Sequence, residues 1–408
     1  MAARKDSRGY ALYKGECQRK GDGRYSYSYT DFKGERHVVY AKTLADLRKK
    51  EKVIKRELED GINPDEAERL TLNDVYFRFM AQKYNLKEST YVNYKYSYER
   101  FVMDTFGKKK ICKIKYTDIK CFYHYLLSEK GIAANTLETI NNVIHPALDM
   151  AVRDGALRTN PSKGVMGEIK KSNIWVKPKR HALTIPQQKA FLDYTKKAPD
   201  CRGWLPMMTV FLGTGMRMGE LLGLRWEDLD FEKRAISVNH SMSTRPDRYG
   251  KCAPKISTPK TEAGTRTIPM VDEVYDAFLE EYEISRCIGF SNYSVDGYSH
   301  FVFVAGSGGV YTPTAVNSAI KRIIKGYNEE ETKLALKEKR EPVLLPDFSA
   351  HHLRHTFCTR LCENESNLKV IQSIMGHADI STTMDIYAEC TEEKKMEVLG
   401  NINGKIFT

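Results

Sequence analysis

Residues 349–388 constrain this chain more than any other stretch, because they combine helical spacing with an unusual set of reactive side chains. His351 and Arg354 stand three positions apart, so that on a helix they share one face. Phe357 and Leu361 carry apolar side chains at helical spacing and would bury the opposite side. The stretch therefore predicts a helix that is buried on one side and presents a histidine and an arginine on the other.

Further reactive side chains surround this helix in the sequence. A Met-Gly-His turn ends at His377, and Tyr387 lies ten residues later; upstream, a glycine turn brings Arg217 to the start of another predicted helix. Arginine offers a planar fork of donors for phosphate oxygens, histidine donates or accepts protons near neutral pH, and tyrosine can act as a covalent nucleophile. Phosphoryl transfer mainly requires positioning and charge stabilisation around phosphorus, so this set suits that chemistry.

At these residues the chain resembles the tyrosine recombinase family, which includes lambda integrase and the integrases of conjugative transposons. TGMRMGEL resembles the first-arginine motif of the family, HHLRHTF its His-x-x-Arg motif, and MGHADISTTMDIY the segment that carries the nucleophile. The resemblance is specific over residues 183–390 and looser over residues 1–165. It implies a mainly α fold with small β-sheets (α+β).

The resemblance also implies how the site works. The two arginines would clamp the scissile phosphate, and the tyrosine would attack it to give a 3′-phosphotyrosyl link and a free 5′ hydroxyl. One histidine would donate to a phosphate oxygen or accept the tyrosine proton, the other would hold a phosphate oxygen or orient the nucleophile, and a lysine would protonate the departing 5′ oxygen. The implied catalytic residues are Arg217, Lys260, His351, Arg354, His377 and Tyr387, with Glu220 and His355 in support.

No cofactor and no metal are expected for this reaction. The phosphotyrosyl bond conserves the energy of the broken phosphodiester, so that rejoining needs no ATP. The arginines and the lysine supply the positive charge that a metal would otherwise bring. No cluster of carboxylates at metal-ligand spacing accompanies the motifs, although Asp379 and Asp385 are near in sequence.

The same residues also allow plainer interpretations. The two arginines could form ordinary salt bridges to Glu220 or Asp228. Lys255 could take the place of Lys260, or Lys260 could only bind a phosphate. We interpret His355 as a core histidine that supports the site from behind.

The composition indicates a polyanionic partner and a reducing compartment. Lys and Arg number 65 against 53 Asp and Glu, a formal net charge of +12, which suits nucleic acid, although charge alone also fits a merely basic protein. Nine cysteines without a C-x-x-C pair predict free thiols in the cytoplasm, and we interpret Cys358 and Cys362 as core residues rather than metal ligands. No signal peptide and no membrane span are expected.

A length of 408 residues suits two or three domains. We expect an arm-type DNA-binding domain, a helical core-binding domain, a basic linker, and a catalytic domain with a C-terminal tail. Their predicted bounds are 1–65, 66–167, 168–182 and 183–408.

The first domain is predicted to be a small sheet with one helix. Strands are expected over 24–30 and 37–40 around a turn at 32–34, and a helix over 44–58 capped by Thr43. Three tyrosines alternate with Ser and Thr along the first of these strands, and the sequence leaves open which face meets DNA. A basic hairpin that only tethers the protein to phosphates is the plainer alternative. The candidate DNA-binding residues here are Arg24, Lys33 and Arg36.

The second and third domains are predicted in less detail. Helices are expected from Thr71, from Ser89 or Thr90, and over 118–127 and 135–152; the core lysines that could reach a duplex backbone are Lys87, Lys95, Lys108, Lys109 and Lys110. In the catalytic domain we expect helices over 187–195 and 204–212, a strand over 235–239, and a hairpin of two strands over 255–269. Residues 284–300 and 325–346 are interpreted as surface insertions.

The predicted function is site-specific recombination of a mobile element, that is, integrase- or excisionase-type strand exchange on double-stranded DNA with core and arm sites. The resemblance implies a homo-tetramer coupled through exchange of the C-terminal tail around 391–399, a possible accessory excision factor, and a bacterial, cytoplasmic, nucleoid-associated location. A type IB topoisomerase and a catalytically silent DNA-binding regulator are the alternatives. The N-terminal basic domain favours the recombinase, because a topoisomerase that relaxes DNA does not need a second site-specific DNA-binding domain.

Overall fold

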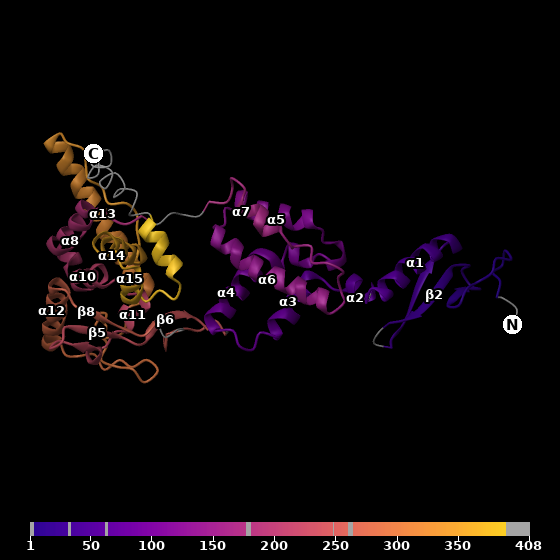
Figure 1. Cartoon of the computed structure of the whole chain (residues 1–408), viewed down its shortest axis with the longest axis horizontal. Coiled ribbons are helices and arrows are strands. Elements are labelled where there is room, and N and C mark those ends of the chain that lie inside the picture. The colour runs from indigo at the N-terminus through magenta and orange to yellow at the C-terminus, as the bar shows by residue number, and fades with distance from the viewer. Residues whose placement is uncertain are drawn as a thin grey trace, which may run out of the picture. The chain divides into compact units, whose positions relative to one another are not determined.

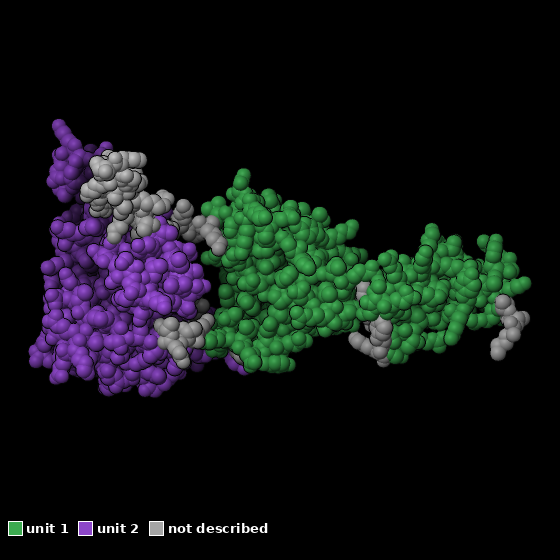
Figure 2. Space-filling model, in the orientation of Figure 1, with its two compact units in different colours: residues 1–178 green, residues 179–408 purple. Residues whose placement is uncertain are grey.

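The computed structural model describes residues 4–31, 34–61, 64–176, 181–247, 249–259 and 264–388. Figure 1 shows the order of the elements along the chain. The chain divides into two units, residues 1–178 and residues 179–408 (Figure 2). The mainly α fold with small antiparallel sheets is the fold class expected from the sequence.

The N-terminal part of the first unit is a three-stranded antiparallel sheet with one helix. Tyr25, Tyr27 and Tyr29 of the central strand are buried together with Leu47 and Ile54 of the helix. The alternating tyrosines therefore form the face that packs on the helix, and the Ser/Thr face of the strand points outward. The elements are β1 (Glu16–Gln18), β2 (Tyr25–Thr30), β3 (Arg36–Ala41) and α1 (Leu44–Glu59), with strand order β1-β2-β3.

The outer face of this sheet carries exposed apolar and basic side chains. In the β2–β3 register, Ser26 lies opposite Tyr40 and Ser28 opposite Val38, and both Tyr40 and Val38 are exposed. The Arg24 guanidinium lies 5.9 Å from the centre of the Tyr40 ring. This placement resolves which face of the strand is free to meet a partner.

The rest of the first unit is a helical bundle with its own apolar core. Thr71 caps the first helix of the bundle core with a reciprocal capping box to Asp74, and the rings of Tyr76 and Tyr98 stack with their centres 3.7 Å apart. The elements are α2 (Pro64–Arg69), α3 (Leu72–Ala81), α4 (Glu88–Tyr98), which continues as the π-helical turn η1 (Glu99–Met103), the 3₁₀ turns η2 (Phe106–Lys108) and η3 (Ile111–Lys113), α5 (Tyr116–Ser128), α6 (Ala134–Arg153) and α7 (Val165–Lys170).

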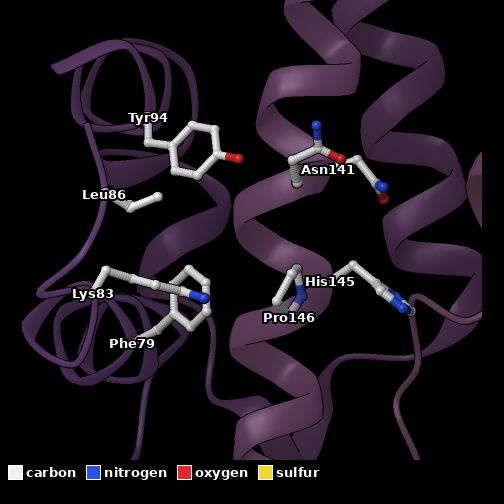
Figure 3. A pocket seen from close by; sticks show the side chains of 8 residues that line it. Phe79, Lys83, Leu86, Tyr94, Asn141, His145 and Pro146 are labelled. Carbon is white, nitrogen blue, oxygen red and sulfur yellow. The ribbon is translucent and has the colours of Figure 1, made fainter. Parts of the chain in front are cut away.

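A pocket of about 290 Å³ opens between α3, α4 and α6 of this bundle. Figure 3 shows the hydroxyl of Tyr94 directed toward Asn141, with Phe79 and Pro146 below them. The lining combines apolar rings with amides and one lysine, and it holds none of the motif arginines or the motif tyrosine. This pocket is therefore no candidate for the phosphoryl-transfer chemistry.

The second unit packs helices around small sheets, with a core shared by α10, α12 and α13. Its sheets have the strand orders β4-β5-β8 and β6-β7. The helices are α8 (Ile185–Lys197), α9 (Pro199–Arg202), α10 (Leu205–Thr214), α11 (Met218–Gly223), η4 (Trp226–Asp228), α12 (Asp272–Ile288), α13 (Pro313–Glu338), α14 (Ala350–Asn364) and α15 (Leu368–Met375); the strands are β4 (Leu229–Asp230), β5 (Ala235–Val238), β6 (Ser241–Pro246), β7 (Cys252–Ser257) and β8 (Arg266–Pro269).

The expected hairpin over residues 255–269 is wrong. The strand β7 pairs with β6, whereas β8 pairs with β5 in another sheet. The turn of the β6–β7 hairpin is organised by Asp247, whose carboxylate accepts hydrogen bonds from the backbone N–H groups of Tyr249 and Lys251. A local turn thus decides the pairing of β7, and β8 belongs to the other sheet.

Two smaller expectations also need correction. Residues 325–338 are not part of a surface insertion, because they continue the long helix α13, whose buried side chains include Ala335. The helix α4 begins at Glu88, and neither Ser89 nor Thr90 caps it.

Candidate active site

The first-arginine motif is shaped by a glycine that no other residue can replace without strain. Gly215 ends α10 with φ = 60°, in the left-handed region. A Cβ atom at this position would lie 2.4 Å from Cδ1 of Phe357 and 3.1 Å from Sδ of Met375. The backbone of Gly215 can therefore approach α14 and α15 closely, and its carbonyl oxygen accepts a hydrogen bond of 2.5 Å from Nη1 of Arg354.

Arg217 is held at the N-terminus of α11 by two acceptors. Its Nη1 donates to Oε1 of Glu220 at 2.7 Å, and its Nη2 donates to the carbonyl oxygen of Gly376 at 2.5 Å. Its backbone N–H also donates to Oε2 of Glu220, which completes the cap of the helix. The side chain of Arg217 remains 41% exposed, so its guanidinium can still meet a ligand from solvent.

Arg354 lies on the buried side of the same cluster. It is 4% exposed, and its Nη2 donates to the carbonyl oxygen of Met375 at 2.7 Å. Burial, together with repulsion from Arg217, lowers the pKa of Arg354 to about 9. The guanidinium therefore remains charged at neutral pH, but its environment disfavours that charge.

His377 directly follows the turn that receives these hydrogen bonds. Gly376 ends α15 with φ = 63°, and this left-handed residue turns the chain so that His377 is buried, with Nδ1 2.9 Å from Oγ1 of Thr383. Burial, followed by the charges of Arg354 and Arg217, lowers the pKa of His377 to about 4. His377 is therefore neutral at pH 7. The charge of His351, which is exposed on α14, acts in the same direction.

Tyr387 lies on a helical segment, residues 380–388, that packs on α14 and α15. Its ring is partly buried against a cluster that contains Cys358, Cys362 and Met375. The carbonyl of Met375, a member of this cluster, is the acceptor of Arg354. The two cysteines are buried core residues of α14, as expected from the sequence.

Glu220 connects the site to an arginine that the sequence did not single out. Arg266 at the start of β8 donates from Nη1 and Nη2 to the two carboxylate oxygens of Glu220, at 3.2 and 2.8 Å. Burial alone would raise the pKa of Glu220, but the hydrogen bond and charge of Arg266 and the charge of Arg217 hold it below its ordinary value. Nothing in the sequence distinguishes Arg266 from the many other arginines of the chain.

The remaining candidates are placed as follows. Lys260 lies outside the described residues, and Lys255, the alternative, lies in β7. His355 is buried and lines a pocket together with residues 181–186. The salt bridge between Arg217 and Glu220 that the plainer interpretation foresaw is present, whereas Asp228 pairs with Arg225 instead.

The candidate DNA-binding residues lie on the surface of the first unit, where most have local partners. In the bundle, Lys108 and Lys109 lie 3.2 and 3.3 Å from Asp104 and Asp118, and such exposed pairs contribute little to stability. A duplex phosphate can therefore compete for these lysines. Of the other bundle lysines, Lys87 precedes α4, Lys95 lies within α4 near Glu99, and Lys110 donates to the carbonyl of Arg69. In the N-terminal sheet, Arg24 pairs with Asp22 and Arg36 donates to Ser28. Lys33 lies outside the described residues.

Potential metal ligands gather elsewhere. Among the described residues, Asp31, Glu35 and His37 bring ligand atoms within 4.8 Å of one another at the end of the β2–β3 pair. Asp31 already accepts from the Glu35 N–H at 2.9 Å and lies 3.0 Å from Nε2 of His37, so these groups serve the turn. The cysteines with free thiols include Cys17, Cys112, Cys121, Cys201, Cys252 and Cys287. None of the described helices has the length and hydrophobicity needed to cross a bilayer.

Comparison with known proteins identifies the class of this site. Residues 182–394 match the phage integrase family, residues 1–66 match the DNA-binding domain of Tn916 integrase, and residues 71–127 match the N-terminal SAM-like domain of phage integrases. The chain belongs to the phage integrase family, and it is a tyrosine-type, site-specific DNA recombinase.

Relatives and solved structures agree with this assignment. The transposase from transposon Tn916 of Enterococcus faecalis is 31% identical over 98% of this chain and 96% of its own length. The Tn1549 transposon integrase in complex with transposon right end DNA superposes with a TM-score of 0.70 at 29% identity, over 82% of this chain and 100% of that one. A lambda integrase dimer bound to a core site shares the fold, with a TM-score of 0.54 at 16% identity over 92% of this chain and 95% of that one.

Proposed function

We propose that this recombinase cleaves DNA where α11, α14 and α15 meet, with Tyr387 as the nucleophile. The observation that carries the proposal is the convergence of Arg217 and Arg354 on the adjacent carbonyls of Gly376 and Met375. These arginines are 137 positions apart in the sequence, yet both lie beside His377. Two guanidinium groups held side by side are suited to the non-bridging oxygens of one phosphate.

The proposed reaction exchanges one phosphate ester for another. The phenol oxygen of Tyr387 attacks phosphorus, the bond from phosphorus to the 5′ oxygen breaks, and a 3′-phosphotyrosyl ester and a 5′ hydroxyl result. His351 takes the phenolic proton, while Arg217 and Arg354 stabilise the charge on the pentacoordinate phosphorus. His377 donates a hydrogen bond to a phosphate oxygen.

Lys260 is proposed to protonate the departing 5′ oxygen. It lies between β7 and β8, and β8 begins with Arg266, which reaches the arginine cluster through Glu220. A flexible ammonium group on such a connection can approach the leaving group. The reaction is proposed to need neither metal nor ATP, since the fixed cations offset the phosphate charge and the phosphotyrosyl ester conserves the bond energy.

The first unit is proposed to bind DNA through two domains, residues 1–65 at arm sites and residues 66–167 at the core site. The outer face of the N-terminal sheet supports arm binding, because Arg24 and Arg36 lie there with the exposed ring of Tyr40. The lysines around α4 and the loop after it are proposed to hold the core duplex backbone. Residues 168–182 serve as the linker to the catalytic domain, residues 183–408.

On DNA, the recombinase is proposed to act as a homo-tetramer that exchanges its C-terminal tails, with an accessory excision factor setting direction. Its relation to transposon integrases supports a conjugative element as host, and bacterial DNA in the cytoplasm, at the nucleoid, as its place of work. The full-length relation to transposases and integrases favours recombination over type IB relaxation and over a silent regulator.

A nicked suicide substrate tests the nucleophile directly. The nick lets the short 5′-hydroxyl strand diffuse away after attack, so the covalent complex accumulates and is visible on a denaturing gel. Tyr387→Phe should abolish this complex while leaving DNA binding unchanged, and Tyr293→Phe, at an exposed tyrosine outside the motifs, should behave like the parent. A covalent complex with Tyr387→Phe would refute the assignment.

A further inference from the structure

Three consecutive carbonyl oxygens before His377 each accept a hydrogen bond from a different arginine. Ile374 accepts from Nε of Arg266 at 2.7 Å, Met375 from Nη2 of Arg354 at 2.7 Å, and Gly376 from Nη2 of Arg217 at 2.5 Å. Two of these arginines belong to the motifs of the family, and Arg266 belongs to neither motif. The turn that positions His377 is thus held from three directions.

Arg266 uses all three nitrogens of its guanidinium group within the protein. Nη1 and Nη2 bind the two oxygens of Glu220, and Nε binds the Ile374 carbonyl. The side chains of Arg266 and Glu220 are 4% and 6% exposed, so neither is available to a DNA phosphate. Such a planar, three-acceptor arrangement needs the guanidinium fork, and a lysine ammonium could not reproduce it.

The contacts of Glu220 pass this restraint on to Arg217. The oxygen Oε1 of Glu220 lies 3.2 Å from Nη1 of Arg266 and 2.7 Å from Nη1 of Arg217. Because Arg266 fixes the plane of the carboxylate, it also fixes where Glu220 holds the Arg217 guanidinium. The hydrogen bond from Nε of Arg266 to the Ile374 carbonyl also fixes the turn that follows. In this turn the next two carbonyls accept hydrogen bonds from Arg354 and Arg217.

We propose that Arg266 is a positioning residue of the recombination site, which presents Arg217 to the scissile phosphate through Glu220 and through the Ile374–Gly376 turn. This inference rests on the proposed role of Arg217. Arg266 itself does not touch DNA. Its loss should therefore weaken the stabilisation of phosphate charge, and it should leave the affinity for DNA unchanged.

A substrate with a methylphosphonate at the scissile position separates this role from a general loss of structure. Replacing one non-bridging oxygen by methyl removes the negative charge that Arg217 is proposed to offset. Single-turnover cleavage of the ordinary phosphate by Arg217→Met should be slowed about 100-fold or more, the range found when one transition-state donor is removed. On the methylphosphonate, the same variant should come within a few-fold of the parent.

Arg266→Met should follow the same pattern, with about 10- to 100-fold slower cleavage of the phosphate, a few-fold effect on the methylphosphonate, and unchanged DNA binding. Arg266→Lys retains the positive charge and should show the same selective defect, so it replaces the methionine variant if that one does not fold. Arg286→Met removes an exposed arginine of α12 and should match the parent on both substrates.

The outcomes separate the two claims. If the methylphosphonate does not rescue Arg217→Met, the assigned role of Arg217 fails. If it rescues Arg217→Met, but both Arg266 variants are as fast as the parent or are slowed equally on the two substrates, Arg266 is a structural ion-pair residue only and the present inference is overturned.

Discussion

Replacing Glu220 by glutamine tests the electrostatic logic of the site most directly. The carboxylate accepts four hydrogen bonds, two from Arg266 and two from Arg217, one of the latter from its backbone N–H. Glutamine keeps one acceptor oxygen, but it turns an NH₂ group toward a guanidinium and removes the only negative charge of this network. Arg266, whose side chain is 4% exposed, then has no counter-ion there.

The expected loss of stability follows from this burial. Removing one partner of a buried ion pair costs about 3–5 kcal/mol, and the retained acceptor places Glu220→Gln at the low end, about 3 kcal/mol. For a unit of 150–250 residues, one kcal/mol shifts Tm by about 2–4 °C, so the Tm of the second unit should fall by roughly 6–12 °C.

The loss should also depend on pH. The folded-state pKa of Glu220 lies below the ordinary glutamate value of 4.5, so the carboxylate stabilises the fold above that pH. This contribution is lost as the pH falls through the folded-state value. The Tm difference between the parent and Glu220→Gln should therefore be constant at higher pH and shrink below about pH 4.5.

Tryptophan fluorescence of the full chain can follow this transition, because Trp204 and Trp226 of the three tryptophans belong to residues 179–408. Glu283→Gln is the matched control, since Glu283 forms an exposed pair with Arg286 and its change should leave Tm unchanged. A Tm decrease at pH 7 no larger than that of the control would refute the reasoning. So would a difference that persists undiminished in acid.

Three more expectations follow from the structure. Gly215→Ala should destabilise the second unit by about 2–4 kcal/mol in denaturant unfolding, from left-handed backbone strain and overlap with Phe357. The lowered pKa of His377 makes stability fall as pH drops from about 6.5 toward 4, and His377→Asn should flatten that part of a Tm–pH profile. Arg36→Ala should weaken arm-site binding and reduce its salt dependence by about one ion, whereas Lys49→Ala on α1 should not, in a filter-binding salt titration.

The sequence predicts well those features that depend on neighbouring residues. Thr43 was expected to cap a helix and Thr71 to begin one, and each side chain accepts a hydrogen bond from the backbone N–H three residues later. The family itself could be recognised because its motifs are short and local. Tyr91, Tyr94 and Tyr98 recur at helical spacing; Tyr98 belongs to the core of the bundle, and the other two pack against it.

Features that depend on distant partners were not predicted. The strand β8 pairs with β5 rather than with the preceding strand β7, and the partners Val238 and Arg266 lie 28 positions apart. Similarly, the role of Arg266 depends on its hydrogen bonds to Glu220, 46 positions earlier, and to the carbonyl of Ile374, 108 positions later. Arginine is common on protein surfaces, so the residue type alone did not indicate a buried role for Arg266.

The site carries an excess of positive charge that a phosphate anion can neutralise. Three arginines, Arg217, Arg266 and Arg354, lie near one buried carboxylate, so the cluster carries two positive charges in excess. Glu220 pairs with Arg217 and Arg266, whereas Arg354 is held by the carbonyl oxygens of Gly215 and Met375. The lowered pKa values of Arg354 and His377 are consequences of this excess as well as of burial. A phosphate anion between the arginines would relieve the repulsion and raise both pKa values. The folded protein thus maintains an unfavourable arrangement of charge that a DNA phosphate makes favourable, which is the preorganisation that electrostatic catalysis requires.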